Sequence, residues 1–531
     1  MIYNPLEEYN SKFKSLHNQN TADFFEDLVE KSGVDIEANR QTVKEYSEIQ
    51  TSLEKLNKKL RWRKFWRVLM ILTIILIVVV ILKLNPNIKS LKEEIESADK
   101  KAEELLSLAK SQVAPLISLF SATDSLRLIE KTIENIKFEP CFTEKQERDM
   151  RLNYDFSSAT SLEESTLEVL AGHYNENPFV FENKLVHTMG VETYHGYKRI
   201  TWTETYRDSE GKLRTRTRSE TLHATLTKPK PFYSTKVVLN YGAQGGANLC
   251  FSRDAGDLDE KSKAQLERHI KRGERKLKRK TDNAIKGDGS FMSMSNSEFE
   301  VLFDALDRTN EVEFRTLFTP LAQTNLAQLI TTPDPYGDDF EFIKNRRMNL
   351  ISTKHSQGRN IVLNPKSFES HSFDVVKTQF LNENAEFFKA VYFDFAPLFA
   401  IPIYQERPVH SLKPIPPCEQ MYSDRQCETL ANAMNRSRVV HPNTKTNAIL
   451  KTSFSGMDIG GQKTTVSAYS YDIEPRVDHV RVHGGDGRWH NVAVNWDEYL
   501  PLEHETEFCV CDAKNGGRTA LAVKNGLCIF N

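Results

Sequence analysis

The sequence predicts an α+β protein made of N-terminal helices, one transmembrane helix, a helical coiled-coil stalk, and β-rich and mixed α+β soluble domains. Three observations support this fold class. Residues 68–82 (VLMILTIILIVVVIL) have no polar side chain except Thr73, and the next fifty residues repeat apolar side chains at helical spacing. From Phe138 onward, the spacing changes to the alternation typical of strands.

Residues 1–64 form the predicted helical N-terminal region. Thr21 precedes the segment FFEDLVEK, which ends at Gly33. A second helix begins near Ile36, and its apolar side chains recur at steps of three and four residues at Val43, Tyr46, Ile49, Leu53, Leu56 and Leu60. This stripe would pack either on a partner helix or on the two preceding helices, and the sequence leaves both alternatives open.

Residues 65–84 are predicted to be a transmembrane helix. The segment has twenty residues, about 30 Å as a helix, which is enough to cross a bilayer. A buried core helix would carry a polar stripe, whereas this segment is apolar all round. A cleaved signal peptide is disfavoured, because a long charged segment precedes the run and no small-residue cleavage site follows it.

The flanks of this segment predict its orientation. Seven cations precede it (Lys55, Lys58, Lys59, Arg61, Arg63, Lys64 and Arg67) and three follow it (Lys83, Lys89 and Lys92). The predicted membrane anchor comprises Trp62, Trp66, Arg67, Val68, Leu82 and Lys83, with both tryptophans at headgroup level. We therefore expect a single-pass signal-anchor protein of the cell membrane, with a cytoplasmic N-terminus and an extracytoplasmic body.

Residues 85–137 are predicted to form the helical stalk. Apolar side chains follow a heptad at Ile88, Leu91, Ile95, Ala98, Ala102, Leu105 and Ala109. The stalk would self-associate through Ile88, Leu91, Ile95 and Leu105, or it would fold into an intramolecular helical hairpin, since three heptads are marginal for a free coiled coil. Both alternatives remain open at this point.

Residues 138–258 are predicted to form a β-rich domain with one clear hairpin. Its arms are Arg199–Tyr206 and Leu213–Leu226, and residues 208–212 make the turn. Alternation places Arg214, Arg216 and Arg218 on one face. These arginines would bind an anionic surface, or they are solvated strand charge paired with Glu204 and Glu220 that prevents edge-to-edge aggregation.

Residues 259–287 are predicted to form a basic connecting helix. Ten lysines and arginines lie between positions 261 and 280, against only two glutamates. Such a run raises a nucleic-acid hypothesis, but no aromatic side chains interleave to stack on bases. We interpret the segment as a solvated helix and do not expect nucleic acid as a partner.

Residues 288–404 are predicted to form an α+β domain and residues 405–531 a β-rich C-terminal domain. Ser372–Ala390 has the period of an amphipathic helix, and the segment PLFAIPIY after it is predicted to be a buried strand. In the C-terminal domain an Asp-Gly turn gathers His483, Asp486 and His490, a set that can bind a metal or act as acid and base. Their spacing matches no metal-ligand motif, so we expect no metal there.

Composition and motifs limit the function. The chain has 531 residues with 39% hydrophobic and 27% charged residues and a net charge of −2, which argues against a surface built entirely for nucleic acid. Its seven cysteines do not indicate a disulfide framework. Nucleotide-binding loops and hydrolase motifs are missing from the sequence, and we expect no cofactor and no catalysis.

The predicted function is therefore that of a membrane-anchored scaffold or binding protein, with the lipid bilayer and a protein or anionic polymer as partners. The alternative is a membrane-anchored hydrolase that acts on envelope polymers, with its site between His483 and His490. The enzyme hypothesis stays open because catalytic sites assembled from distant residues leave no local motif.

Four segments carry a resemblance to a known family: SLFSATDSLRLIEKTI in the stalk, the hairpin ITWTETYRDSEGKLRTRTRSETLHATLTKPKPF, then LNYGAQGGANLCFSRD and FKAVYFDFAPLFAIPIYQ. They resemble a family of uncharacterised single-pass bacterial membrane proteins of the mollicute and low-GC Gram-positive type. The resemblance covers most of the chain after residue 60. It implies a shared architecture but supplies no activity and no binding residues.

Overall fold

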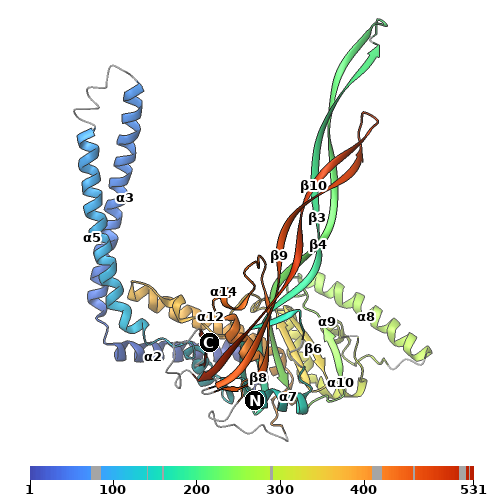
Figure 1. The fold of residues 1–531 in the computed structure, drawn as a ribbon. Coiled ribbons are helices and arrows are strands. Elements are labelled where there is room, and N and C mark those ends of the chain that lie inside the picture. Colours follow the sequence, from blue (N-terminus) through green and yellow to red (C-terminus); the bar gives the residue numbers. More distant parts are fainter. Residues whose placement is uncertain are drawn as a thin grey trace. The chain divides into compact units, whose positions relative to one another are not determined.

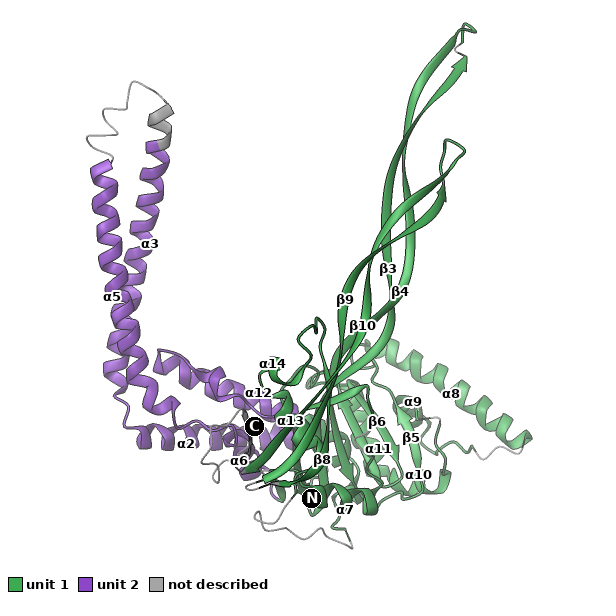
Figure 2. Ribbon diagram, in the orientation of Figure 1, with its two compact units in different colours: residues 1–6, 135–361, 393–531 green, residues 7–134, 362–392 purple. Residues whose placement is uncertain are grey.

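The computed structural model describes the chain except residues 73–84, 140, 158–160, 208, 288–290, 306, 409–420, 459–460, 513–521, 525–526 and 531. The described residues are α+β, with two antiparallel sheets, and Figure 1 labels their helices and strands. They divide into two compact units (Figure 2). Unit 1 contains residues 1–6, 135–361 and 393–531, and unit 2 contains residues 7–134 and 362–392.

Unit 2 is helical. Its elements are the end of α1 (Pro5–Glu8), η1 (Tyr9–Phe13), α2 (Lys14–Ser32), α3 (Ile36–Leu72), α5 (Asn85–Ile117), α6 (Asp124–Thr132), η4 (Pro365–Phe368) and most of α12 (Phe373–Phe399). Gly33 ends α2 as predicted, in the left-handed conformation with φ of 63°. The core combines Phe25 with Val113, Leu128, Phe373 and Phe380, so segments from both ends of the unit's sequence close one apolar interior.

Helices α3 and α5 pack against each other as an intramolecular hairpin. Leu60 of α3 forms one apolar cluster with Ile88 and Leu91 of α5, with Leu56 and Ile95 packed at its edge. At the other end, the Asn39 amide donates to the backbone oxygen of Ala109 at 3.2 Å. The predicted heptad positions Ile88 and Leu91 are only 4% and 5% exposed, so they are buried within the chain itself. Leu105 is half-buried.

The predicted transmembrane helix over residues 65–84 is wrong. Helix α3 ends at Leu72, and residues 73–84 lie outside the described residues. Among the helices that the structure describes, none is both long and apolar enough to cross a membrane. The flanks of the run also lie side by side, because Arg63 Nη1 donates to the backbone oxygen of Asn87 at 3.2 Å. A single span would place these two flanks on opposite sides of a bilayer.

The single-pass placement in the cell membrane, with its signal-anchor and its cytoplasmic N-terminus, is therefore wrong as well. Of the predicted anchor residues, Trp62, Trp66, Arg67 and Val68 belong to α3, where Trp62 is 62% exposed and its ring lies 5.8 Å from that of Trp66. Leu82 and Lys83 lie outside the described residues. Length and apolarity alone do not distinguish a bilayer span from a run whose two flanks contact each other in one helical hairpin.

Unit 1 contains both sheets. The seven-stranded sheet has the order β1 (Ile136–Phe138), β2 (Glu164–Tyr174), β3 (Asn177–Arg207), β4 (Leu213–Gly242), β7 (Met348–Thr353), β6 (Phe340–Asn345) and β5 (Cys250–Arg253). Strands β2 and β3 join through Asn175 and Glu176, whose φ angles of 47° and 70° give the two-residue turn that matches the twist of a hairpin.

The five-stranded sheet of unit 1 comes from the C-terminal part of the chain. Its order is β11 (Ala522–Lys524), β12 (Leu527–Phe530), β10 (Trp489–Asp512), β9 (Gly461–His483) and β8 (Ile449–Asp458). The apolar face of this sheet packs on α13 (Asp424–Asn432), whose Leu430 lies in one cluster with Val466, Ala468 and Val510.

The helices of unit 1 are α7 (Glu144–Tyr154), α8 (Lys263–Lys286), α9 (Ser297–Phe303), α10 (Glu311–Leu317), α11 (Pro320–Thr331), α13 (Asp424–Asn432), α14 (Arg436–Val439) and η5 (Pro402–Gln405). Phe251 of β5 packs edge-on or tilted against Phe303, Phe314 and Phe318. The predicted strand PLFAIPIY is wrong, because Pro397 lies inside α12 and Pro402 begins η5. Residues 398–401 are buried on all sides, and periodicity alone cannot separate a buried helix from a buried strand.

Candidate binding surface

Two hairpins of unit 1 extend beyond the sheets to which they belong. Strands β3 and β4 pair from Phe179 opposite Tyr241 to Arg207 opposite Leu213, and β9 and β10 pair from Gln462 opposite Val510 to His483 opposite Trp489. Figure 1 shows the two hairpins twisted about each other and running outward. We call residues 187–233 and 470–503 the arm, since within this range each strand pairs only with its hairpin partner.

Apolar contacts hold the two hairpins of the arm together. Ile200, Leu222 and Ala224 of the first hairpin form one buried cluster with Val492 and Val494 of the second. A two-stranded ribbon is marginally stable in water, whereas two ribbons that share an apolar face form a small core. The arm therefore has a small apolar core of its own.

Polar contacts reinforce the same crossing. Lys228 Nζ lies 2.9 Å from the carboxylate of Asp478 and 4.0 Å from the centre of the Trp496 ring. Lys198 Nζ donates to the backbone oxygen of Asn491 at 3.1 Å. Each of these contacts joins one hairpin to the other, so they fix the position at which the hairpins cross.

The turn of the second hairpin is attached to the first. The backbone N–H of Gly485 donates to Glu220 Oε2 at 2.6 Å, and a side chain at Gly485 would meet the Trp202 ring at 3.0 Å. Within the turn, His490 Nε2 lies 3.0 Å from both carboxylate oxygens of Asp486. The shorter hairpin therefore ends against the side of the longer one.

This turn is also where the sequence placed a possible metal or acid–base site. Asp486 and His490 do form a pair, but His483 instead contacts the Trp489 ring edge-on at 5.4 Å. The hydrogen bond from His490 lowers the pKa of Asp486. Among the described residues there is no group of three or more histidine, cysteine, aspartate or glutamate side chains that could hold a metal ion. The Asp486–His490 pair shapes the turn.

Beyond the turn, the longer hairpin continues alone. We call residues 201–207 and 213–219 the tip, where every side chain is exposed or half-buried. One face of the tip pairs Trp202 with Arg218, Glu204 with Arg216, and Tyr206 with Arg214. The opposite face carries hydroxyl side chains, from Thr201, Thr203, Thr205, Thr215, Thr217 and Ser219, and ends at the pair Arg207 and Leu213.

The predicted arginine row lies on the first of these faces and is partly neutralised. Glu204 accepts from Arg216 at 3.0 Å and from Arg218 at 2.8 Å, and the Arg216 guanidinium lies 5.2 Å from the Tyr206 ring centre. Glu220, the other predicted partner, is used by the Gly485 N–H. One carboxylate therefore serves two guanidinium groups, and the face stays cationic with aromatic side chains between the charges.

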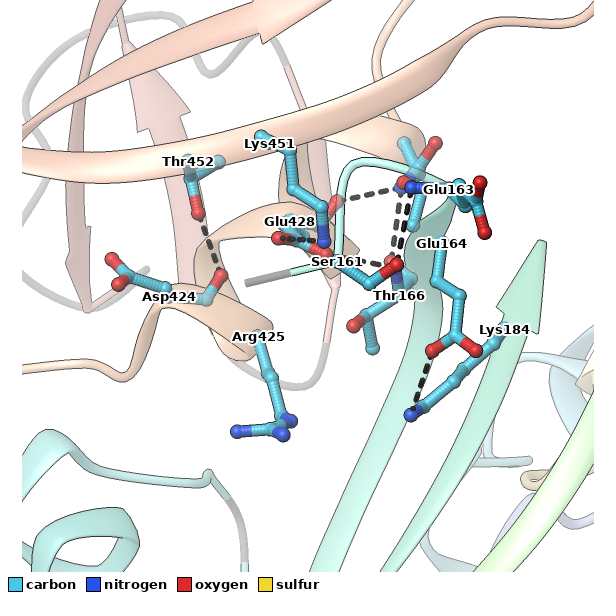
Figure 3. A network of polar contacts seen from close by, with 12 residues as sticks. Ser161, Glu163, Glu164, Thr166, Lys184, Asp424, Arg425, Glu428, Lys451 and Thr452 are labelled. Carbon is cyan, nitrogen blue, oxygen red and sulfur yellow. Dashed lines mark hydrogen bonds and ion pairs between the residues drawn. The ribbon is translucent and has the colours of Figure 1, made fainter. Parts of the chain in front are cut away.

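A second candidate site lies at the base of β3, around Arg425 of α13 (Figure 3). Arg425 Nε donates to Glu182 at 2.6 Å, its Nη1 pairs with Glu147, and its Nη2 donates to the backbone oxygen of Ser157 at 2.9 Å. A cavity of about 130 Å³ adjoins these groups. Arg425 is fully buried, so its three partners replace the water that it loses.

Two lysines complete this network. Lys184 Nζ lies 3.1 Å from Glu164 and 3.5 Å from Glu182. Lys451 Nζ donates to Glu428 at 3.1 Å, and the other oxygen of Glu428 accepts from the Thr166 N–H at 2.8 Å. We call Glu147, Glu164, Glu182, Lys184, Arg425, Glu428 and Lys451 the polar network.

The charges of the polar network are mutually compensated. Burial raises the pKa of Glu147 and Glu428, whereas Arg425 and Lys184 overcome burial and lower the pKa of Glu182. Each of the three cations has a carboxylate partner, so an anionic ligand would have to displace one. The polar network thus joins α7, α13 and β8 to the paired strands β2 and β3, and it anchors the base of the arm.

A third cluster surrounds His355, whose ring stacks on Tyr336 at 3.8 Å. His355 Nδ1 lies 2.5 Å from Asp339, and Nε2 lies 3.4 Å from Asp394. These contacts overcome burial and raise the pKa of His355 to about 9. Ser356 Oγ donates to Asp394 at 2.7 Å. In this geometry the imidazolium stays charged and is a poor base for the neighbouring hydroxyl.

Sequence reasoning found the arginine row but missed the residues that make it a projecting surface. The partners in the polar network are far apart in the sequence, with Glu147, Glu182 and Arg425 on three separate elements, and no spacing signal links them. Trp202 and Tyr206 were visible as alternate residues of the same strand, and their alternation was the signal that places them on the arginine face.

Comparison with known proteins gives no relative for this chain. No family model, no curated protein and no solved structure matches it. The resemblance to a bacterial membrane protein family therefore stays a prediction.

Proposed function

We propose that this chain is a binding protein of the scaffold type, which holds an acidic protein partner at the tip of its arm. The observation that carries the proposal is the difference between the two parts of the longer hairpin. The second hairpin braces the longer one as far as Glu220 and the Trp202 ring, whereas residues 203–207 and 213–219 extend beyond this point with both faces exposed or half-buried. An unbraced two-stranded extension adds little to the stability of a fold.

The side chains of the tip indicate the class of partner. Tryptophan, tyrosine and arginine are the residue types that contribute most to protein–protein binding, and here they alternate on one face. Two of the three arginines share the carboxylate of Glu204, so a partner carboxylate would find guanidinium groups that are only partly neutralised. The opposite face is mostly hydroxyl and has one cation, Arg207, at its end.

The proposal rests on the rigid base as much as on the tip. The polar network fixes β3 to β2, α7 and α13, and the crossing of the hairpins fixes the direction of the arm relative to its own sheets. A contact surface that is held rigidly loses less conformational freedom on binding than a loose loop. This arrangement suits a protein that presents a partner at a set distance from its body.

Site-specific cross-linking tests the proposal. A photoreactive amino acid replaces Thr215 at the tip, or Glu503 at the base of the arm as the matched control, in the full chain within its native cells. The captured protein is then purified, and its affinity for the full chain is measured. We expect capture from position 215, with binding that weakens at least tenfold in the variant R214Q/R216Q/R218Q.

A shortened hairpin provides a second test of the proposal. Residues 203–217 are replaced by Asn-Gly, which joins the paired residues Trp202 and Arg218 through a two-residue turn. The shortened chain should keep the thermal stability of the full chain and lose the captured partner. Unchanged affinity in the shortened chain, or capture only from position 503, would refute the proposal.

A further inference from the structure

Helix α8 of unit 1 packs on its neighbour through one narrow face. Its contacts lie along α9, at the edge of the unit (Figure 2). Gly273 lies so close to Val301 that a Cβ would come within 2.3 Å of its side chain, and Ser297 Oγ donates to Glu274 at 2.7 Å. Leu277 is the one buried side chain of the helix. These contacts fix which face of α8 points away from the body.

The outward face carries a line of four arginines: Arg268, Arg272, Arg275 and Arg279. Their spacing of four, three and four residues keeps them on one stripe of the helix, opposite Gly273 and Leu277. All four side chains are exposed, and within the described part of the chain none of them makes an ion pair or a side-chain hydrogen bond. We call these four residues the arginine line.

Repulsion within the arginine line lowers the stability of α8 in the isolated protein. Like charges three and four residues apart on a helix repel each other, at about 0.2–0.5 kcal/mol for each pair. Lys271 and Lys278 flank the line and add to the repulsion. Glu274 is held by Ser297 on the other side of the helix, and Asp282 lies one turn beyond Arg279, so it offsets only the C-terminal end of the line. An anionic partner would remove this repulsion.

The geometry suits a row of phosphates. Arg268 and Arg279 are eleven positions apart, about 16 Å along the helix, and a duplex carries one phosphate per about 3.4 Å of its axis on each strand, so the line is long enough to reach several phosphates. One guanidinium group can donate two parallel hydrogen bonds to the oxygens of a phosphate. All four residues of the line are arginines and none is a lysine. A duplex presents phosphates along its whole length, so it can meet all four guanidinium groups of the line together.

Other anionic partners fit less well. Stacking on single-stranded bases needs aromatic side chains, and α8 has none. Insertion into a lipid surface needs a free apolar face, but on α8 Leu277 is buried toward α9, Leu266 and Ile270 are half-buried, and Ile285 is the one large apolar side chain that is strongly exposed. The net charge of −2 argued against nucleic acid as a partner. It is a sum over the whole chain, however, and does not report the local positive charge on the outward face of α8.

We propose that the arginine line of α8 binds the phosphate backbone of double-stranded DNA without reading its base sequence. The proposal is independent of the arm, since α8 and the tip are separate surfaces with different chemistry. The tip alternates arginine with aromatic side chains and a shared carboxylate, whereas the arginine line has neither.

Binding of the full chain to a labelled 24-base-pair duplex tests this, with fluorescence anisotropy between about 50 and 200 mM salt. The variant R268Q/R272Q/R275Q/R279Q removes the line, and R207Q/R214Q/R216Q/R218Q removes the same charge from the tip as a matched control. We expect the first variant to lose on the order of 100-fold in affinity at about 0.1 M salt, and to have a salt slope shallower by about 3.6. The control should stay within about threefold of the unchanged chain.

A charge-preserving variant and vesicles complete the experiment. The variant R268K/R272K/R275K/R279K should keep most of the salt slope but bind more weakly, because lysine lacks the paired geometry of guanidinium. Vesicles that contain phosphatidylglycerol should compete poorly with the duplex. The proposal is overturned if the unchanged chain does not bind at 50 mM salt, if the tip variant loses as much affinity as the α8 variant, or if vesicles bind more tightly than DNA.

Discussion

Gly196 of β3 lies directly against the backbone oxygen of Ala493 in β10. A Cβ at position 196 would come within 2.3 Å of that oxygen and within 2.8 Å of the Val494 side chain. The two hairpins of the arm therefore approach each other to backbone distance at this point. Glycine is required here for its lack of a side chain and not for an unusual backbone angle.

Replacing Gly196 by alanine should separate the hairpins. We expect a loss of about 1–3 kcal/mol in the stability of the arm, because the carbonyl that meets the new methyl group belongs to a rigid strand. Hydrogen exchange of the amides in β3 and β10 measures the effect. Gly190→Ala is the matched control: its Cβ would meet the ring of Phe232, which is 44% exposed and free to turn away. Equal exchange in the two variants would contradict the close contact.

Arg425 is expected to be indispensable to unit 1. Arg425→Met leaves Glu147 and Glu182 buried without their guanidinium partner, which typically costs 3–5 kcal/mol, on the order of half the stability of a domain. Urea unfolding measures the loss. Arg151→Met is the control, since Arg151 also contacts Glu147, at 3.2 Å, but is 43% exposed and should contribute less than about 1 kcal/mol. A small effect at position 425 would show that the network is open to water.

The stability of unit 2 should depend on pH through His17. Burial lowers the pKa of His17 to about 4, against about 6.5 in the unfolded chain. Between these values the unfolded chain takes up a proton that the folded chain does not. The contribution of His17 is therefore complete above pH 6.5 and is lost as the pH falls, by about 2.5 kcal/mol at pH 4.5.

Urea unfolding at pH 7.5 and pH 4.5 checks this dependence in the unchanged chain and in His17→Gln. The substitution should remove most of the difference between the two pH values. The Thr132 hydroxyl lies 3.0 Å from His17 Nδ1 and also accepts from the Asn20 amide at 3.2 Å, so Asn20→Ala is a control that changes this contact without removing a titrating group. It should lower the stability equally at both pH values, and a persistent pH difference in His17→Gln would assign the effect to other groups.

Leu91 should stabilise the α3–α5 hairpin within one chain. Leu91→Ala removes a side chain that is 5% exposed beside Leu60 and should cost about 2 kcal/mol locally, seen as faster hydrogen exchange over residues 56–67 and 85–95. Leu108→Ala on the same helix, 48% exposed, should change little. The effect must not depend on protein concentration. A concentration dependence would instead support self-association through Ile88 and Leu91.

The local pattern of the sequence was informative where neighbours in sequence are also neighbours in space. The strand alternation around Arg199–Tyr206 and Leu213–Leu226 predicted a hairpin and the face of its arginines, and both are present in β3 and β4. The length of these strands was not predicted. Their extension depends on the crossing with β9 and β10, which lie about 270 residues later in the chain.

The apolar run shows the opposite case. Its length and composition met the rule for a bilayer span, yet the decisive contacts join Leu60 to Ile88 and Arg63 to Asn87 across the run. The polar network could not be predicted from the sequence either. Nothing in the local sequence shows that Arg425, Glu147 and Glu182 are buried together. The arginine line of α8 was visible as charge, but its exposure required knowing that Gly273 and Leu277 face α9.

Unit 2 is made of two segments that are far apart in the sequence, residues 7–134 and 362–392, so its core is completed late in synthesis. Phe373, Val376 and Phe380 close the apolar interior around Phe25 and Val113, yet they leave the ribosome about 260 residues after the N-terminal helices of the unit. At 5–20 residues per second, roughly 13–50 s pass between the synthesis of these helices and the synthesis of the segment that completes their apolar core. During this interval the apolar side chains around Phe25 and Val113 therefore lack the cover that Phe373, Val376 and Phe380 give them in the complete unit.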